Sequence, residues 1–132
     1  MTDEQIALAR RAVACRGWQW LPGMLGFDPD GMNDPVRVAF PPGKAYRMPT
    51  LEAWGRPSYI VHTELPDLTD HSTLGCLLAL VREHHKEPRL AVVPTGKGWS
   101  VSRVWLRSPH DRVAGVHTLE AEALVAALQA AP

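Results

Sequence analysis

The strongest periodic pattern of apolar residues lies in the middle of the chain. Its apolar positions recur at spacings of three and four residues: Leu74, Leu77, Leu78 and Val81. This spacing predicts a helix over Asp70–Lys86, with Asp70 or Ser72 as its cap and Pro88 forcing its end. On a helical wheel the apolar arc covers about 200°, which is wider than the stripe of about 100° on a surface helix. We therefore expect this helix to be covered on more than one side, by other helices or by a second subunit.

Two further helices are predicted at the ends of the chain. The first covers Asp3–Ala14, where Thr2 and Gln5 have the spacing of a capping box. Gly17 is expected to end that region in a left-handed conformation. The last helix covers Leu119–Ala130, with Thr118 as its expected cap.

Alternating and β-branched segments between these helices predict short strands. Turn residues separate them, and the chain contains 12 Pro and 10 Gly residues. The expected segments are a hairpin of Trp18–Leu21 with Met24–Phe27, single strands at Val36–Phe40 and Tyr59–Thr63, and a hairpin of Leu90–Val93 with Trp99–Arg107. The pattern as a whole predicts a single compact α+β domain over residues 1–132, with an antiparallel β-sheet packed on about three α-helices.

Composition narrows the classes of function. Fourteen basic residues balance fourteen acidic ones, so the chain lacks the basic excess of a general nucleic-acid binder. Neutral charge also removes repulsion between copies, which together with the wide apolar helix predicts a homodimer. Cys15 and Cys76 are too few for a disulfide framework and are expected to be buried free thiols. The polar start and the short apolar run Leu74–Val81 predict a cytoplasmic protein without a membrane segment.

Three segments resemble a family of small uncharacterised proteins encoded by phages and prophages. They are Ala7–Met24, residues 65–81 with Leu65-Pro66-Asp67-Leu68-Thr69-Asp70, and the Glu- and Ala-rich closing helix. The match covers about half the chain, and His71-Ser72 replaces the Pro-Ala expected after Asp70. Asp28–Glu64 matches no pattern of that family. The resemblance implies an origin in a phage or mobile element and an accessory role, and it implies no activity.

Motifs for catalysis or metal binding do not emerge from the spacing. None of the six histidines has zinc-type spacing with another His or Cys. Adjacent His84 and His85 are read as solvated residues at a helix end. Asp28–Asp34 lacks the spacing of a calcium loop, and Gly96-Lys97-Gly98 lacks that of a phosphate loop. Hence no catalytic residue, metal ligand or cofactor is predicted.

Five tryptophans are an unusually high number for 132 residues. Packing against the core is the expected role of Trp18, Trp20, Trp99 and Trp105. Trp54 differs, because it lies in an irregular stretch rich in Pro and Gly. Trp, Tyr and Arg dominate the energetics of protein interfaces. The predicted partner- or ligand-binding residues are therefore Tyr46, Arg47, Trp54 and Arg56.

Three hypotheses for function follow from these observations. The first is a non-enzymatic phage or mobile-element accessory protein that binds a host or phage protein, such as an anti-defence inhibitor of the anti-CRISPR type. The second is a small-ligand or nucleotide sponge that uses the same four residues for stacking and phosphate binding. The third is a small hydrolase or nucleic-acid enzyme that uses some of the histidines.

Overall fold

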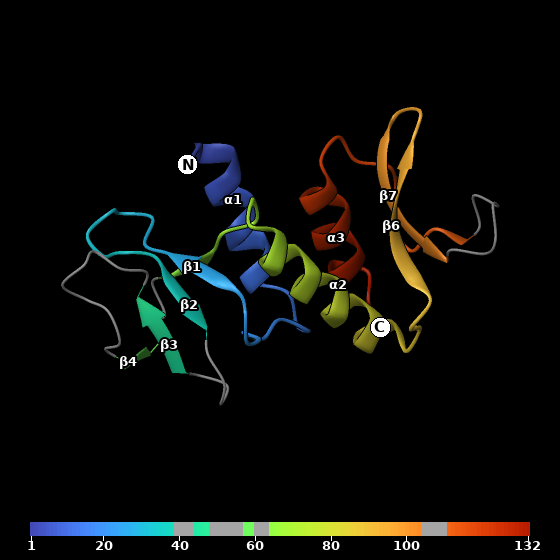
Figure 1. Cartoon of the computed structure of the whole chain (residues 1–132). Coiled ribbons are helices and arrows are strands. Elements are labelled where there is room, and N and C mark those ends of the chain that lie inside the picture. The colour runs from blue at the N-terminus through green and yellow to red at the C-terminus, as the bar shows by residue number, and fades with distance from the viewer. Residues whose placement is uncertain (39–43, 48–56, 60–63, 104–110) are drawn as a thin grey trace.

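A computed structural model describes residues 1–38, 44–47, 57–59, 64–103 and 111–132, with the backbone alone at 44–47 and 57–59. Its described elements follow the α+β pattern predicted from the sequence (Figure 1). In chain order they are α1 (Asp3–Val13), β1 (Leu25–Phe27), β2 (Val36–Val38), β3 (Lys44–Arg47), β4 (Pro57–Tyr59), β5 (Leu65–Pro66), α2 (His71–His85), β6 (Leu90–Thr95), β7 (Gly98–Arg103) and α3 (Glu120–Gln129).

The described strands form two antiparallel sheets at opposite ends of the molecule, with the helices between them (Figure 1). The larger sheet has the strand order β4-β3-β2-β1-β5, and the smaller is the β6–β7 hairpin. The hairpin predicted between Trp18–Leu21 and Met24–Phe27 is wrong. β1 pairs instead with β2 and β5, and Leu25 lies opposite Arg37. The Pro22-Gly23 turn precedes β1, and Gly23 has a φ of +97°.

The helix with the most complete burial is α3, whereas the sequence pattern had singled out α2. Fully buried side chains cover more than half of the circumference of α3, among them Ala123, Leu124, Val125 and Ala127. Figure 1 shows α3 between α1 and the β6–β7 hairpin, and it also packs against α2. Its alanines allow this, because small side chains let neighbouring elements approach closely. We conclude that the C-terminal helix is the centre of the core.

Burial on α2 is uneven around its circumference. Leu77, Leu80 and Val81 are fully buried, whereas Gly75 and Ala79 are exposed. The half-buried Leu74 and Leu78 separate the two sides. The core therefore buries one side of α2, whereas the prediction was covering on more than one side. The side with Gly75 and Ala79 is exposed to solvent in the single chain.

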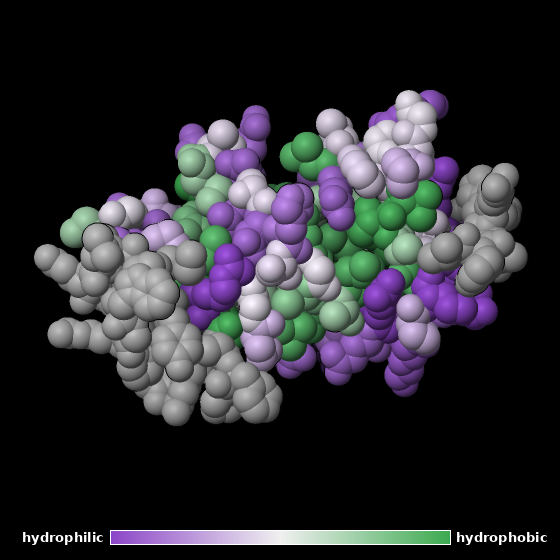
Figure 2. Space-filling view, in the orientation of Figure 1, coloured by the Kyte–Doolittle hydropathy of each residue, from purple (hydrophilic) through white to green (hydrophobic). Residues whose placement is uncertain are grey.

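Helix ends follow the predicted chemistry at two of three N-termini. The Thr2–Gln5 capping box and the Asp70 cap are both present. The expected Thr118 cap is wrong, since Leu119 occupies the N-cap of α3 and its own amide donates to Glu122 Oε2 at 3.2 Å. Leu119 is 53% exposed, and Figure 2 shows apolar surface where α3 and the hairpin lie in Figure 1.

Gly17 plays a different role from the expected one. Helix α1 is capped by Ala14, and Gly17 does not have a positive φ. The His84 imidazole packs directly on it, so that a Cβ at residue 17 would lie 2.7 Å from His84 Cδ2. The glycine is needed here for close approach of α2 to the segment after α1. In the described part of the chain, no helix is long and apolar enough to span a membrane.

Candidate functional site

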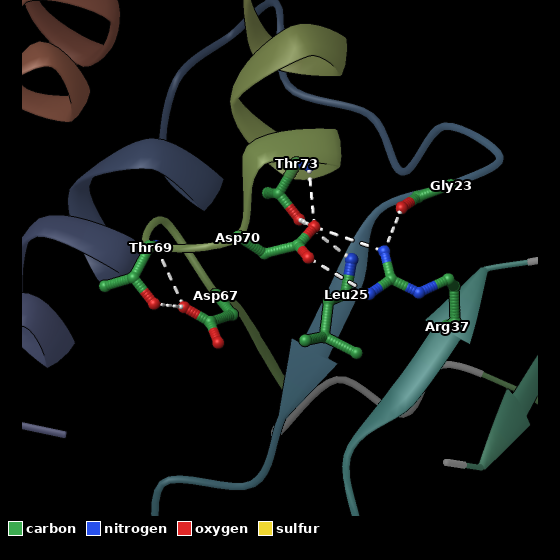
Figure 3. A network of polar contacts seen from close by, with 7 residues as sticks. All are labelled: Gly23, Leu25, Arg37, Asp67, Thr69, Asp70 and Thr73. Carbon is green, nitrogen blue, oxygen red and sulfur yellow. Dashed lines mark hydrogen bonds and ion pairs between the residues drawn. The ribbon is translucent and has the colours of Figure 1, made fainter.

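An ion pair between Arg37 and Asp70 joins the larger sheet to the start of α2 (Figure 3). Arg37 Nη1 donates to Asp70 Oδ2 at 3.1 Å, and Nη2 donates to Oδ1 at 3.0 Å. Nη1 also donates to the carbonyl of Gly23 at 2.7 Å. This two-pronged geometry is the strongest form of an arginine–carboxylate contact. It fixes β2 against the turn that precedes β1 and against the N-terminus of α2.

Thr73 extends this network into the core. Its hydroxyl donates to Asp70 Oδ2 at 2.9 Å and accepts from the amide of Leu25 at 2.9 Å. The Thr73 amide also donates to Asp70 Oδ2, which is the N-cap bond of α2. Since Thr73 is fully buried, each of these bonds satisfies a polar group that has no access to water. The network thus connects β1, β2 and α2.

Electrostatics keep Asp70 ionised. The hydrogen bond from Arg37, followed by those from Thr73, lowers the pKa of Asp70 from its ordinary value of 3.8 to about 2. Both carboxylate oxygens are occupied by these donors. A carboxylate that is ionised at neutral pH and accepts hydrogen bonds at both oxygens is poorly suited to exchange protons with a substrate. We therefore assign the pair a positioning role: it holds the larger sheet on the helices.

The predicted binding residues lie partly within the described structure. Tyr46 and Arg47 are on β3, where the backbone of Tyr46 is paired with Arg37 and that of Arg47 with Val36. Trp54 and Arg56 lie outside the described residues. Hence the structure places two of the four residues on a strand next to β2, and the other two remain predictions.

The described histidines are more involved in packing than the sequence suggested. The reading of His84 and His85 as solvated is wrong. His85 Nε2 donates to the carbonyl of Ala127 at 2.7 Å, and the His84 ring packs on Gly17. Both side chains are half-buried. In the described ranges, no group of three His, Cys, Asp or Glu side chains could hold a metal ion.

Cys15 and Cys76 are free thiols that are half-buried. Burial raises the pKa of both, and the thiols donate to the carbonyls of Arg11 and Pro22 respectively. A raised pKa reduces the thiolate fraction at neutral pH, and the thiolate is the reactive form. The geometry therefore favours packing over nucleophilic chemistry at these positions.

The acidic loop after β1 is internally bonded. Asp28 Oδ1 accepts from the amide of Asp30 at 3.0 Å, and Oδ2 accepts from Asn33 Nδ2 at 2.7 Å. These bonds lower the pKa of Asp28. This is the geometry of an Asx turn, which accounts for the Asp and Asn residues without a bound cation.

The tryptophans that the structure describes have the expected packing role. Trp18, Trp20 and Trp99 are partly buried against the core, and Trp105 lies outside the described ranges. The Trp18 and Trp20 rings meet edge to face with centroids 5.6 Å apart. Buried Trp18 Nε1 has no hydrogen-bond partner among the described residues.

Sequence reasoning missed Arg37. Thirty-three residues separate it from Asp70, so no local spacing could link them. Asp70 was identified only as a helix cap. The available signal was the position of Arg37 between Val36 and Val38 in a short alternating segment. If other residues cover the side of the strand that carries Arg37, its charged group needs a hydrogen-bonding partner there.

Comparison with known proteins gives no family: no protein-family model, no curated protein and no solved structure matches this chain.

Proposed function

We propose that this chain is a non-enzymatic accessory protein of phage or mobile-element origin that acts in the host cytoplasm by binding a host protein. Inhibition of a defence system, in the manner of an anti-CRISPR protein, is the concrete form of the proposal. The resemblance of residues 7–24, 65–81 and the closing helix supports the origin. The contact itself is proposed to involve Tyr46, Arg47, Trp54 and Arg56.

The observation that carries the proposed contact is the position of β3. It lies beside β4, the terminal strand of the larger sheet among the described strands. Tyr46 on β3 is paired with Arg37 on β2, and Arg37 is fixed to α2 through Asp70. A strand next to the edge of a sheet and held by a rigid frame can take part in binding with little loss of conformational freedom.

A pull-down with matched variants tests this proposal. Tagged wild-type chain is used as bait in lysate of the bacterial host, and captured proteins are quantified by mass spectrometry. Replacing Tyr46, Arg47 or Trp54 with Ala should reduce capture of one defined protein at least about tenfold. Lys97→Ala is the control, because Lys97 is exposed in the β6–β7 turn at the other end of the molecule. Equal capture by all four variants would refute the proposed contact.

A small ligand is the second candidate for the same residues. The Tyr46 and Arg47 positions on one strand, with Trp54 and Arg56 nearby in sequence, would also suit stacking and phosphate binding. Thermal denaturation in the presence of nucleotides separates the two. The protein-contact proposal predicts no shift in Tm, whereas a sponge predicts stabilisation that grows with nucleotide concentration.

We also propose a homodimer, in which a second copy covers the open side of α2. Gly75 and Ala79 are exposed there and would let another helix approach closely. Light scattering at high protein concentration should then give the mass of a dimer. Ala79→Arg should shift it to the monomer without loss of helix content, and a wild-type monomer would rule out this part of the proposal.

A further inference from the structure

The outer side of β6 is an open edge of the smaller sheet, because no described strand pairs with it. The outer side of β7, in contrast, is occupied by the segment that precedes α3. The amide of Trp99 donates to the carbonyl of His117 at 2.7 Å. The amide of Val113 donates to the carbonyl of Val101 at 3.0 Å. In the described part of the chain, the hairpin thus presents one strand edge, on β6, for pairing with another strand.

The register of the hairpin shows which backbone groups face this open edge. Val92 lies opposite Val101, and Pro94 lies opposite Trp99. In an antiparallel pair, two opposite residues either bond to each other or both point away from each other. Because Val101 and Trp99 bond on the outer side of β7, the backbone groups of Val92 and Pro94 point to the open edge. Among the described residues, none bonds to the backbone of Val92 or to the carbonyl of Pro94.

The backbone of Leu90, which also faces away from β7, is already bonded within the chain. Its carbonyl accepts from Arg82 Nε at 2.7 Å, and its amide donates to the carbonyl of Glu87 at 3.4 Å. Pro94 has no amide hydrogen. The open edge therefore offers one donor, on Val92, and two acceptors, on Val92 and Pro94. An extended backbone alongside β6 would match them with three hydrogen bonds.

A second copy of this chain is a poor match for the open edge. If two β6 strands paired antiparallel about Val92, each Pro94 would lie opposite a Leu90. The carbonyl of Pro94 would then need the amide of Leu90, which is bonded to Glu87 in its own chain. A proline and an edge residue bonded within its own chain are features that protect strand edges against pairing between copies. The open edge thus favours a strand from a different protein.

The surface beside β6 favours apolar side chains in that strand. Val92 lies on the same side of the hairpin as Leu90 and Val101, which are fully buried in the core, but Val92 itself is only half-buried. On the other side of β6, Ala91 and Val93 are also half-buried. Figure 2 shows apolar surface between the positions of α3 and β6 in Figure 1. An apolar side chain opposite Val92 would remove part of this surface from water.

We propose that the open edge of β6 binds an extended segment of another protein, which is added to the hairpin as a strand. The segment runs antiparallel to β6, because antiparallel pairing is the more stable form. It carries apolar side chains at alternate positions, and one of them lies opposite Val92. β6 and β3 belong to different sheets at opposite ends of the molecule (Figure 1), so this proposal is independent of the contact proposed for β3.

Amide hydrogen exchange of the full chain, measured by NMR with a synthetic peptide, tests the proposal. The probe is Lys-Val-Thr-Val-Thr-Val-Lys, acetylated and amidated at its ends. In the free chain the amide of Val92 should exchange faster than that of Val93, whose groups point to Ser100 within the hairpin. Peptide at about ten times its Kd should slow exchange at Val92 by about tenfold. Unchanged exchange at Val92 would overturn the proposal.

Two N-methylated forms of the peptide provide a matched comparison. Methylation of the valine nitrogens removes the donors that face β6, whereas methylation of the threonine nitrogens changes groups that point away from β6. The first form should bind about tenfold or more weakly than the parent peptide, and the second should bind as the parent does. Equal affinity of the two forms would contradict strand addition.

Val92→Pro removes the donor on the open edge and keeps the bonds between β6 and β7, because the backbone of Val92 points away from β7. Val92→Thr keeps both the amide and the branched side chain and is the control. Peptide affinity should be about tenfold lower in the proline variant than in the threonine variant. If circular dichroism shows that Val92→Pro is unfolded, the methylated peptides decide the question with the wild-type chain.

Exchange in the free chain tests the other occupants of the edge. Slower exchange at Val92 as the protein concentration rises, without peptide, would identify a second copy on β6 and overturn the proposal. An amide of Val92 that exchanges as slowly as that of Val93 in dilute solution would show that the chain itself covers the edge, and it would overturn the proposal as well.

Discussion

Arg37 and Asp70 form a two-pronged ion pair across 33 residues of sequence, with nitrogen–oxygen distances of 3.1 and 3.0 Å. Asp70 is at the same time the N-cap of α2. The Asp70 carboxylate thus accepts hydrogen bonds from Arg37 on β2 and from the first turn of α2. Loss of this carboxylate should weaken both the contact between β2 and α2 and the N-cap of α2. A substitution at Asp70 therefore tests how the larger sheet is held on the helices.

Replacing Asp70 by Asn should lower the free energy of unfolding by about 1.5–3 kcal/mol. The change removes the charge that Arg37 and the start of α2 require, and partial exposure of the pair limits the loss. Urea denaturation followed by circular dichroism measures it. Asp30→Asn is the control, because Asp30 is exposed and the change should cost less than about 0.5 kcal/mol. Equal stability of the two variants would show that the ion pair contributes nothing measurable.

Acid should remove the contribution of Asp70. Because the pKa of this carboxyl is lowered to about 2 in the folded chain, its stabilisation is present above the ordinary value of 3.8 and is lost as pH falls toward 2. Between about pH 5 and pH 2 the wild type should lose roughly 1–2 kcal/mol more stability than Asp70→Asn does. Urea midpoints measured at several pH values give the two curves. Parallel curves would contradict the assigned pKa.

Gly17→Ala should destabilise the chain by about 1–3 kcal/mol, because the new Cβ would meet the His84 ring. Thermal unfolding gives the size of the effect. In an His84→Ala background the same change should cost much less, since the ring is gone. A similar cost in both backgrounds would mean that the loss comes from the backbone of residue 17 and not from His84.

Gly75→Ala should stabilise the chain, in contrast to Gly17→Ala. Gly75 is exposed within α2, and no atom lies within 4 Å of the position of an added Cβ. Alanine should therefore stabilise the helix by about 0.5–1 kcal/mol in the monomeric chain. The urea midpoint should rise at low protein concentration. A fall there would indicate that something contacts this side of α2 even in dilute solution.

The elements with a strong local signal were predictable from the sequence. All three helices lie within about one residue of their expected limits, because apolar spacing, the Thr2–Gln5 box and Pro88 are local features. The β6–β7 hairpin was also identified from its turn. β3 at Lys44–Arg47 was missed, since it lies in a stretch without clear alternation and is defined by pairing with β2 and β4.

Pairing and packing between distant segments could not be predicted. Local reasoning paired Trp18–Leu21 with Met24–Phe27, whereas β1 pairs with strands that follow it by ten residues and by forty. The burial of α3 depends on its neighbours α1, α2 and the β6–β7 hairpin. The apolar pattern of α3 alone therefore could not show that this helix is the most buried of the three.

Site-specific crosslinking in bacterial host cells tests the proposed protein contact most directly. A photoreactive amino acid is placed at Tyr46, at Trp54 or, as the control, at Lys97, and products are identified by mass spectrometry. The account predicts that Tyr46 and Trp54 crosslink to the same host protein and that Lys97 does not. Crosslinking of that protein only from Lys97, or no specific product from Tyr46 and Trp54, would contradict it.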